Sequence, residues 1–284
     1  MGGIVWLASY PKSGNTWLRA FLANLWHTGD GPADINNLSI RNAADRRTFD
    51  EALGVESSNM TMDEIERARP AFYRALAAGS PDTVYLKLHD AYVYTSAGEP
   101  LIPADATRRT VYLVRNPLDV AVSFSDHLGK APDVTLECMG DTGFSFSAWK
   151  DRLPEQLEQR LLSWSGHVQS WLDQTALPVY LMRYEDMLRQ PLSAFRGCVE
   201  FLGLDAGVAE IERALAFSSF SALSAQEKSS GFRERSPAAR SFFRKGKAGD
   251  WRENLTEQQV QLILRDHSAV MQRLGYISES GSPF

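Results

Sequence analysis

The chain has 284 residues, which is enough for one large domain or two small ones. Apolar residues make up 44% and charged residues 23%, as in globular proteins generally, which excludes collagen-like, coiled-coil and disordered chains. The formal net charge of -5 argues against a surface that is basic throughout, so we expect neither nucleic acid nor a membrane as a partner. A local anion-binding site is compatible with this charge.

Short apolar runs alternate with helical patterns from the N-terminus onward. Residues 3–9 predict a buried strand, residues 17–25 a helix, and residues 62–78 a helix that starts with a capping box at Thr61 and Glu64. The later apolar runs predict strands at 83–89, 109–114 and 178–182, and helices at 117–128, at 157–171 and after Thr256. Polar or Gly-rich segments at about 30–60, 129–147 and 226–250 predict mobile loops.

This alternation predicts an α/β fold in which helices cover both faces of a parallel sheet. No linker or internal repeat divides the sequence, so we expect residues 1–284 to form a single domain. The two cysteines, Cys138 and Cys198, are far apart and have no partner at metal-ligand spacing, which indicates free thiols in a reducing cytoplasm. Neither a signal peptide nor a long apolar run is evident, so we expect a cytoplasmic protein.

Conspicuous polar groups follow three of the predicted strands. They are Ser9-Tyr-Pro-Lys-Ser-Gly-Asn-Thr16, Lys87-Leu-His89 and Arg115-Asn-Pro117. Ligands of an open parallel sheet bind outside the carboxyl ends of its strands, so we expect these groups to converge. The first group combines Lys12, Gly14 and hydroxyl donors between a strand and a helix. This combination is typical of a phosphate-binding loop, although the Walker A pattern is absent.

Three motifs resemble those of the cytosolic-type sulfotransferases, which use 3'-phosphoadenosine 5'-phosphosulfate (PAPS). Tyr10-Pro-Lys-Ser-Gly-Asn-Thr-Trp17 is similar to their 5'-phosphosulfate loop, with Asn15 in place of the usual Thr. Arg115-Asn-Pro-Leu-Asp-Val-Ala-Val-Ser123 looks like their 3'-phosphate motif, and Arg244-Lys-Gly-Lys-Ala-Gly-Asp-Trp251 matches their C-terminal signature. The resemblance implies the P-loop-kinase-like sulfotransferase fold, and the pattern also looks similar to that of bacterial sulfotransferases.

The resemblance also implies a role for each matching residue. The 5'-phosphosulfate would be bound by Lys12, Ser13, Gly14, Asn15 and Thr16, and the 3'-phosphate by Arg115, Ser123, Arg244, Lys245 and Gly246. The adenine would contact Trp17, Tyr184 and, on a weaker match, Ser218. These basic residues, together with Lys87 and Lys247, would gather around one nucleotide. We therefore expect the acidic excess to lie elsewhere, on the outer surface.

His89 is the candidate general base, because it ends a strand and matches the family's K-x-H element. Imidazole titrates near neutral pH, so it can take the acceptor's proton as the sulfuryl group is transferred. Lys12 and Lys87 would neutralise the charge that develops on the bridging oxygen. We also expect Ser123 to be a catalytic residue. No second metal ligand lies at suitable spacing from His89, so we expect no metal. We expect His127, His167 and the remaining histidines to be structural.

Two alternatives stay open, a small-molecule kinase and a non-catalytic nucleotide-binding protein of related fold. The missing Walker A motif argues against a kinase, and the presence of both Lys12 and His89 argues against a protein that has lost catalysis. Aromatic and apolar residues such as Phe124, Met139 and Phe232 favour a small phenolic or hydrophobic acceptor with a hydroxyl or amine group. The family's dimerisation motif matches only in part after Trp251, so we expect a monomer or a weak homodimer.

Overall fold

A computed structural model describes residues 2–148 and 153–284. The described residues fall into two compact units. The first unit takes its residues from Met1–Tyr10, Arg41–Tyr112 and Asp141–Leu181, and the second from Pro11–Ile40, Leu113–Gly140 and Met182–Phe284. Each unit therefore draws on three separate segments of the chain.

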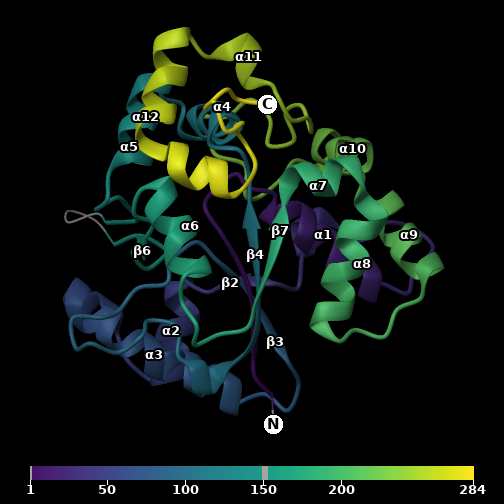
Figure 1. The fold of residues 1–284 in the computed structure, drawn as a ribbon. Helices are drawn as coiled ribbons and strands as arrows, with labels where there is room; N and C mark the ends of the chain where they lie inside the picture. Colours follow the sequence, from purple (N-terminus) through teal and green to yellow (C-terminus); the bar gives the residue numbers. More distant parts are fainter. Residues whose placement is uncertain (1, 149–152) are drawn as a thin grey trace. The chain divides into compact units, whose positions relative to one another are not determined.

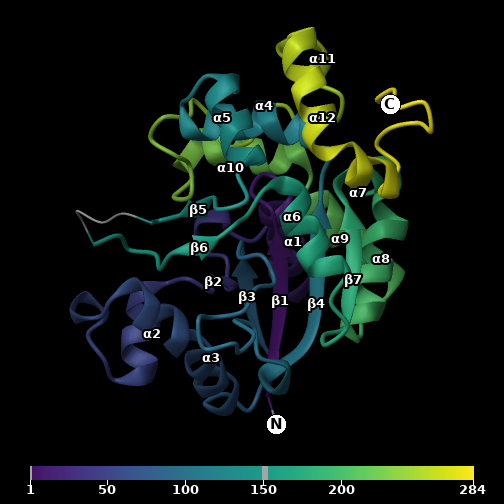
Figure 2. The same ribbon diagram turned by 60° about the vertical axis from the view of Figure 1, so that its left-hand side comes forward.

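The described residues include a five-stranded sheet in the order β2-β3-β1-β4-β7, whose strands are labelled in Figure 1. Its strands are β1 (Ile4–Ser9), β2 (Arg41–Asn42), β3 (Val84–Leu88), β4 (Thr107–Val114) and β7 (Val179–Arg183). Figure 2 shows β1 between β3 and β4. Every residue of β1 is buried, as its continuous apolar run predicts. The prediction of a parallel sheet is confirmed, since β1 and β2 both pair in parallel with β3.

The first unit contains most of this sheet, together with several helices and a short hairpin. They are α2 (Arg46–Leu53), α3 (Met62–Ala78), α6 (Trp164–Leu172), the 3-10 turns Ser57–Asn59 and Ala104–Ala106, and the hairpin of β5 (Ser145–Phe146) and β6 (Gln159–Arg160). The predicted capping box of Thr61 and Glu64 starts α3. Trp6 of β1 packs edge-on against Tyr73 of α3, with ring centroids 4.9 Å apart.

The second unit is mainly helical. Its helices are α1 (Asn15–Trp26), α4 (Pro117–Leu128), α5 (Pro132–Gly140), α7 (Tyr184–Arg189), α8 (Pro191–Leu202), α9 (Val208–Phe217), α10 (Phe220–Ser230), α11 (Trp251–Asn254), α12 (Glu257–Arg273) and the 3-10 turn Ile35–Asn37. α1 packs against α9, and α4 packs against α5 and α12. The ring centroids of Phe21 in α1 and Phe195 in α8 are 4.4 Å apart. Apolar faces thus hold α1 and α4, the two helices that follow predicted phosphate motifs.

Three predicted boundaries are wrong. The segment 129–147, predicted as a loop, contains α5 and β5. The segment 30–60, predicted as a loop with at most short helices, contains short helices but also β2. The predicted helix 157–171 begins only at Trp164, because Leu162 adopts a left-handed φ of 59° and Ser163 then caps the helix. Its first apolar residues belong instead to the segment around β6, which shows that apolar spacing alone did not locate the helix start.

Neither Cys138 nor Cys198 forms a disulfide bond with another described residue, and burial raises the pKa of Cys198 to about 12. Within residues 2–148 and 153–284, no helix combines the length and the apolar character that a membrane span requires.

A buried ion pair lies directly beyond β3. Arg69 of α3 donates to both carboxylate oxygens of Asp90, at 2.9 and 2.5 Å, and these side chains are 2% and 0% exposed. Asp90 also accepts from the backbone N–H of Arg160 at 3.0 Å. One carboxylate therefore joins α3, β6 and the end of β3.

We predict that Asp90→Asn lowers the free energy of unfolding by about 3–5 kcal/mol, because it leaves the buried Arg69 cation without a counter-charge. Urea denaturation of the purified variant measures this loss. Arg47→Ala, which breaks the exposed pair of Arg47 and Glu51, is the matched control and should change stability little. Equal effects of the two substitutions would contradict the importance of the buried pair.

Candidate functional site

The loop between β1 and α1 has a backbone that favours anion binding. Lys12 and Gly14 have φ angles of 67° and 101°, both in the left-handed region. Residues in this region turn successive backbone N–H groups toward one side of a loop, which creates a concave anion site. A Cβ atom on Gly14 would lie 2.9 Å from Cδ2 of Tyr184, so only glycine fits there without displacing the ring.

The hydroxyl of Ser13, just before the start of α1, has no hydrogen-bond partner among the described residues. Ser13 is nevertheless fully buried. Gly14 is the N-cap of α1 and offers no side chain to the first N–H groups of the helix. Since buried polar groups are nearly always paired, this loop suits a ligand that brings acceptor oxygens to the helix N-terminus.

Arg115, the first residue of the second motif, contacts both the first motif and the C-terminal motif. It follows β4 and donates to the carbonyl of Lys12 at 3.3 Å and to the carbonyl of Lys247 at 3.2 Å. Its guanidinium lies 4.4 Å from the centre of the Tyr184 ring. The Nε of this 8% exposed side chain has no acceptor among the described residues, so it can still bind an anion.

Tyr184, the first residue of α7, packs against the loop and against Arg115. Its ring meets that of Trp17 edge-on, with centroids 5.9 Å apart. Burial raises the pKa of Tyr184, although the nearby Arg115 opposes this shift. The two aromatic residues predicted to contact adenine therefore lie together. Ser218 differs, since its fully buried hydroxyl donates to the carbonyl of Ala214 at 2.7 Å, and its adenine contact stays a prediction.

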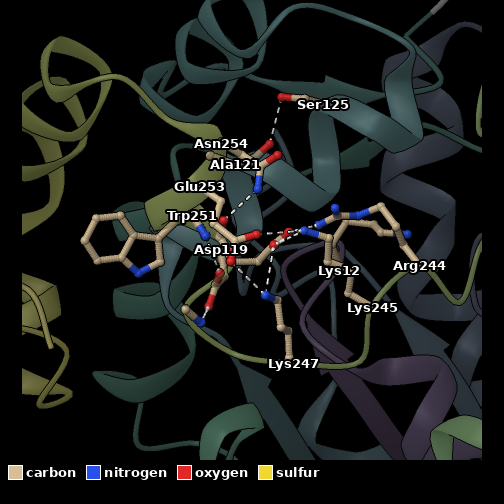
Figure 3. Close-up of polar contacts among 12 residues, drawn as sticks. Lys12, Asp119, Ala121, Ser125, Arg244, Lys245, Lys247, Trp251, Glu253 and Asn254 are labelled. Carbon is tan, nitrogen blue, oxygen red and sulfur yellow. Dashed lines mark hydrogen bonds and ion pairs between the residues drawn. The ribbon is translucent and has the colours of Figure 1, made fainter.

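Asp119 ties the C-terminal motif to α4. Its carboxylate accepts from the backbone N–H groups of Gly249 at 2.7 Å and Trp251 at 3.1 Å. The side chain is 1% exposed, and Figure 3 shows it beside the cations of the C-terminal motif. The same helix carries Ser123, which is half-buried. Asp119 thus fixes the C-terminal signature to the helix of the second motif.

Asp250 is paired with cations that we expect to bind the 3'-phosphate. It forms ion pairs with Arg244 and Lys245, and its carboxylate is 3.7 Å from Nζ of Lys247. Although burial acts to raise it, the pKa of Asp250 is lowered by hydrogen bonds from Lys245 and Arg244. A carboxylate therefore lies inside this cationic motif, while the expectation that the acidic excess lies on the outer surface stays a prediction. Clustered cations repel one another, and a buried carboxylate between them offsets that repulsion.

Glu185 supports the turn that carries Arg115. It accepts from the backbone N–H of Asn116 and from the hydroxyl of Tyr276, each at 3.0 Å. Burial raises the pKa of Glu185. Gly246 also has a left-handed φ of 60°, and a Cβ atom on it would lie 2.3 Å from Cδ2 of Phe220. Both contacts fix backbone close to the predicted 3'-phosphate residues.

The second unit holds every predicted nucleotide-binding residue. They are Lys12, Ser13, Gly14, Asn15, Thr16, Trp17, Arg115, Ser123, Tyr184, Ser218, Arg244, Lys245 and Gly246. Nζ of Lys12 lies 4.2 Å from the centre of the Phe242 ring. The predicted acceptor residues Phe124 and Met139 are fully buried, so they belong to the core of this unit and do not line an open pocket.

His89 and Lys87 lie at the end of β3 in the first unit. Ala8 pairs with Leu88 in the parallel register, so His89 lies beside Ser9. Nδ1 of His89 is 2.8 Å from the carbonyl oxygen of Ser9 and 3.3 Å from its hydroxyl. A carbonyl oxygen only accepts hydrogen bonds, so Nδ1 carries the proton and the lone pair of the neutral ring is on Nε2. A base that acts through Nε2 requires this tautomer.

His167, expected to be structural, is fully buried in the first unit. It lies 3.0 Å from the carbonyl oxygen of His89 through Nε2 and 2.8 Å from the hydroxyl of Tyr112 through Nδ1. Burial lowers the pKa of His167 to about 3. The ring is therefore neutral, with Nε2 donating to His89 and Tyr112 donating to Nδ1.

A model of the sulfotransferase domain family matches residues 4–275. Among curated proteins, flavonol 3-sulfotransferase of Flaveria bidentis is 25% identical over 273 residues, which cover 91% of this chain and 78% of the relative. Sulfotransferase 2A6 of Rattus norvegicus is 26% identical over 261 residues, covering 90% of this chain and 80% of the relative.

Solved structures give the same fold. Mouse sulfotransferase SULT7A1 complexed with PAP aligns with a TM-score of 0.59 at 21% identity, covering 98% of this chain and 86% of the other. Retinol dehydratase in complex with androsterone and inactive cofactor PAP aligns with a TM-score of 0.61 at 19% identity. The alignment covers 95% of this chain and 80% of the other.

The buried histidine predicts a pH effect on stability. Because the pKa of His167 is about 3 in the folded protein and 6.5 ordinarily, only the unfolded chain binds this proton between those values. Relative to His167→Gln, the wild type should lose about 1.4 kcal/mol of unfolding free energy per pH unit as pH falls from 6 to 4.5. Urea denaturation of both proteins across that range measures the difference. A constant difference would contradict the neutral, buried state of His167.

Proposed function

Since this chain belongs to the sulfotransferase family, we propose that it transfers the sulfuryl group of PAPS to a hydroxyl or amine of a small acceptor. In this reaction the bond from sulfur to the bridging oxygen breaks and a bond from sulfur to the acceptor forms. The products are the sulfated acceptor and adenosine 3',5'-bisphosphate (PAP). The observation that carries the proposal is the contact of Arg115 with the backbones of Lys12 and Lys247, which unites three phosphate motifs in one unit.

The loop from Lys12 to Thr16 would hold the 5'-phosphosulfate. The buried hydroxyl of Ser13, the left-handed backbone at Gly14 and the start of α1 all suit a polyanion. Asn15 supplies a hydrogen-bonding side chain at the position of the family's usual Thr. Trp17 and Tyr184 would contact the adenine on the same side of the unit as Arg115, which fits their mutual packing.

Arg115, Ser123, Arg244, Lys245 and Gly246 would bind the 3'-phosphate. A phosphate that carries more negative charge than a carboxylate would replace Asp250 as the partner of Arg244 and Lys245. Asp119 would meanwhile keep the C-terminal loop attached to α4 through the N–H groups of Gly249 and Trp251. Nucleotide binding would then exchange one set of ion pairs for another, so that no bare cluster of cations has to be maintained.

His89 would act as the general base. Its Nδ1–H bond to Ser9 keeps the lone pair on Nε2, where it can take the acceptor's proton as the acceptor attacks sulfur. Lys12 and Lys87 would stabilise negative charge on the bridging oxygen, and Ser123 would assist from the 3'-phosphate side.

A hydrophobic alcohol or phenol is the proposed acceptor class. Relatives and neighbours whose names mention flavonol, retinol and androsterone support this class, because these compounds share an apolar body with one reactive hydroxyl. Incubating the protein with PAPS and a set of phenols, alcohols and amines, followed by mass spectrometry of the products, would identify the acceptor. The absence of a mass gain corresponding to one sulfuryl group on any acceptor would oppose the proposal.

We predict that His89→Ala lowers kcat with the best acceptor by about 10²- to 10⁴-fold, the usual contribution of a general base. Binding of PAP should be unchanged, because no predicted nucleotide contact is removed. Steady-state kinetics and titration calorimetry measure the two quantities. Wild-type turnover in this variant would show that His89 is not the base.

Arg115→Ala should weaken PAP binding by about 1.5–3 kcal/mol, the range for hydrogen bonds to charged groups. Titration calorimetry measures this loss, and Arg196→Ala, which removes an exposed ion pair on α8, serves as the control. Equal PAP affinity in the two variants would oppose the assignment of Arg115 to the 3'-phosphate.

A further inference from the structure

The segment that follows β3 is held by one helix of the first unit. Nε2 of His167 donates to the carbonyl of His89 at 3.0 Å, and Nε1 of Trp171 donates to the carbonyl of Asp90 at 3.0 Å. The hydroxyl of Ser170, on the same helix, accepts from the backbone N–H of Tyr92 at 3.0 Å. Three side chains of α6 therefore bind three backbone groups within four consecutive residues.

His167 is itself fixed by aromatic neighbours. The ring of Tyr112 stacks on it with centroids 5.7 Å apart and an interplanar angle of 25°, and Tyr10 meets it edge-on at 5.4 Å. The hydroxyl of Tyr112 lies 2.8 Å from Nδ1. Because burial keeps the ring neutral, only one tautomer satisfies both contacts, and in that tautomer Nε2 is the donor.

We propose that His167 is a positioning residue for His89, which it holds through the carbonyl of His89 so that the His89 ring keeps its Nδ1–H bond to Ser9. This inference rests on the proposed role of His89 as the base. The carbonyl and ring of one residue share its Cα atom, so fixing the carbonyl limits rotation of the backbone that carries the ring. A small displacement of a reacting group costs much of the rate, which gives the contact a functional consequence.

The matched pair of substitutions is His167→Phe and Tyr112→Phe. Each keeps an aromatic ring in place. Tyr112→Phe removes only the hydrogen bond between Tyr112 and His167, whereas His167→Phe removes that bond and the one to the carbonyl of His89. Only His167→Phe removes the donor to His89, whereas Tyr112→Phe leaves Nε2 of His167 in place. A purely structural role predicts a loss of stability in both variants without a change in kcat per folded site. A positioning role predicts that kcat per folded site falls in His167→Phe alone.

The first readout is kcat with PAPS and the best acceptor, divided by the number of PAP-binding sites found by calorimetry so that unfolded protein does not count. We expect His167→Phe to lose on the order of 10²-fold in kcat per site with unchanged Kd for PAP. Tyr112→Phe should keep wild-type kcat per site. His167→Gln should recover most of the rate, because its amide N–H reaches about as far as Nε2. If His167→Phe does not fold, His167→Asn replaces it, since its shorter amide lacks that reach.

The second readout does not depend on turnover. Long-range proton–nitrogen NMR spectra of ring-labelled histidines report which nitrogen of His89 carries the proton. We expect Nδ1–H in the wild type and in His167→Gln, and a mixture of tautomers in His167→Phe. His267→Gln, a change at a buried histidine of α12 in the second unit, should leave the His89 signals unchanged.

The outcomes separate this inference from the proposed function. Unchanged kcat per site or unchanged His89 signals in His167→Phe would overturn the positioning role. Full activity of His89→Ala would instead overturn the role of His89 as the base, and the NMR spectra would still decide whether His167 fixes its tautomer.

Discussion

The hydrogen bonds of the Arg115 guanidinium hold together the three motifs of the second unit. The guanidinium is almost completely buried, and it links the backbone of the β1–α1 loop to the backbone of the C-terminal motif while it covers the ring of Tyr184. These two segments are separated by more than 200 residues in the sequence. A lysine could not form both links, because it lacks the planar set of five donors that arginine provides.

Acidic residues support this cationic centre from within. Asp119 holds the C-terminal motif by two backbone N–H groups, Glu185 holds the turn before α4, and Asp250 neutralises Arg244 and Lys245. The net charge of -5 therefore says little about the site, because cations and carboxylates are interleaved there. Buried cations without such partners would be costly, so these carboxylates stabilise the motif in the structure described.

The sequence predicted the fold class, the main strands and helices such as α3 correctly, because apolar period and capping residues act locally. It also predicted that Lys12, Arg115 and Tyr184 belong together, although this rested on resemblance. The sequence did not predict the role of Asp250, because a sequence motif does not show which of its charged side chains form ion pairs. His167 was missed because a histidine within a helix gives no signal of what its ring contacts. Asp119 and Asp250 both lie within the sequence motifs. An acidic residue inside a cationic motif is the sequence signal that could have identified them.

The central claim is that the second unit binds a nucleotide through separate sites for its 5'- and 3'-phosphates. Titration calorimetry with PAP and with adenosine 5'-monophosphate tests it most directly, because the two ligands differ only in the 3'-phosphate. The account predicts that PAP binds at least about tenfold more tightly in the wild type, as one charged hydrogen bond of 1.5–3 kcal/mol would give. It also predicts that Arg115→Ala removes most of this difference. Equal affinity of the wild type for the two nucleotides would contradict it.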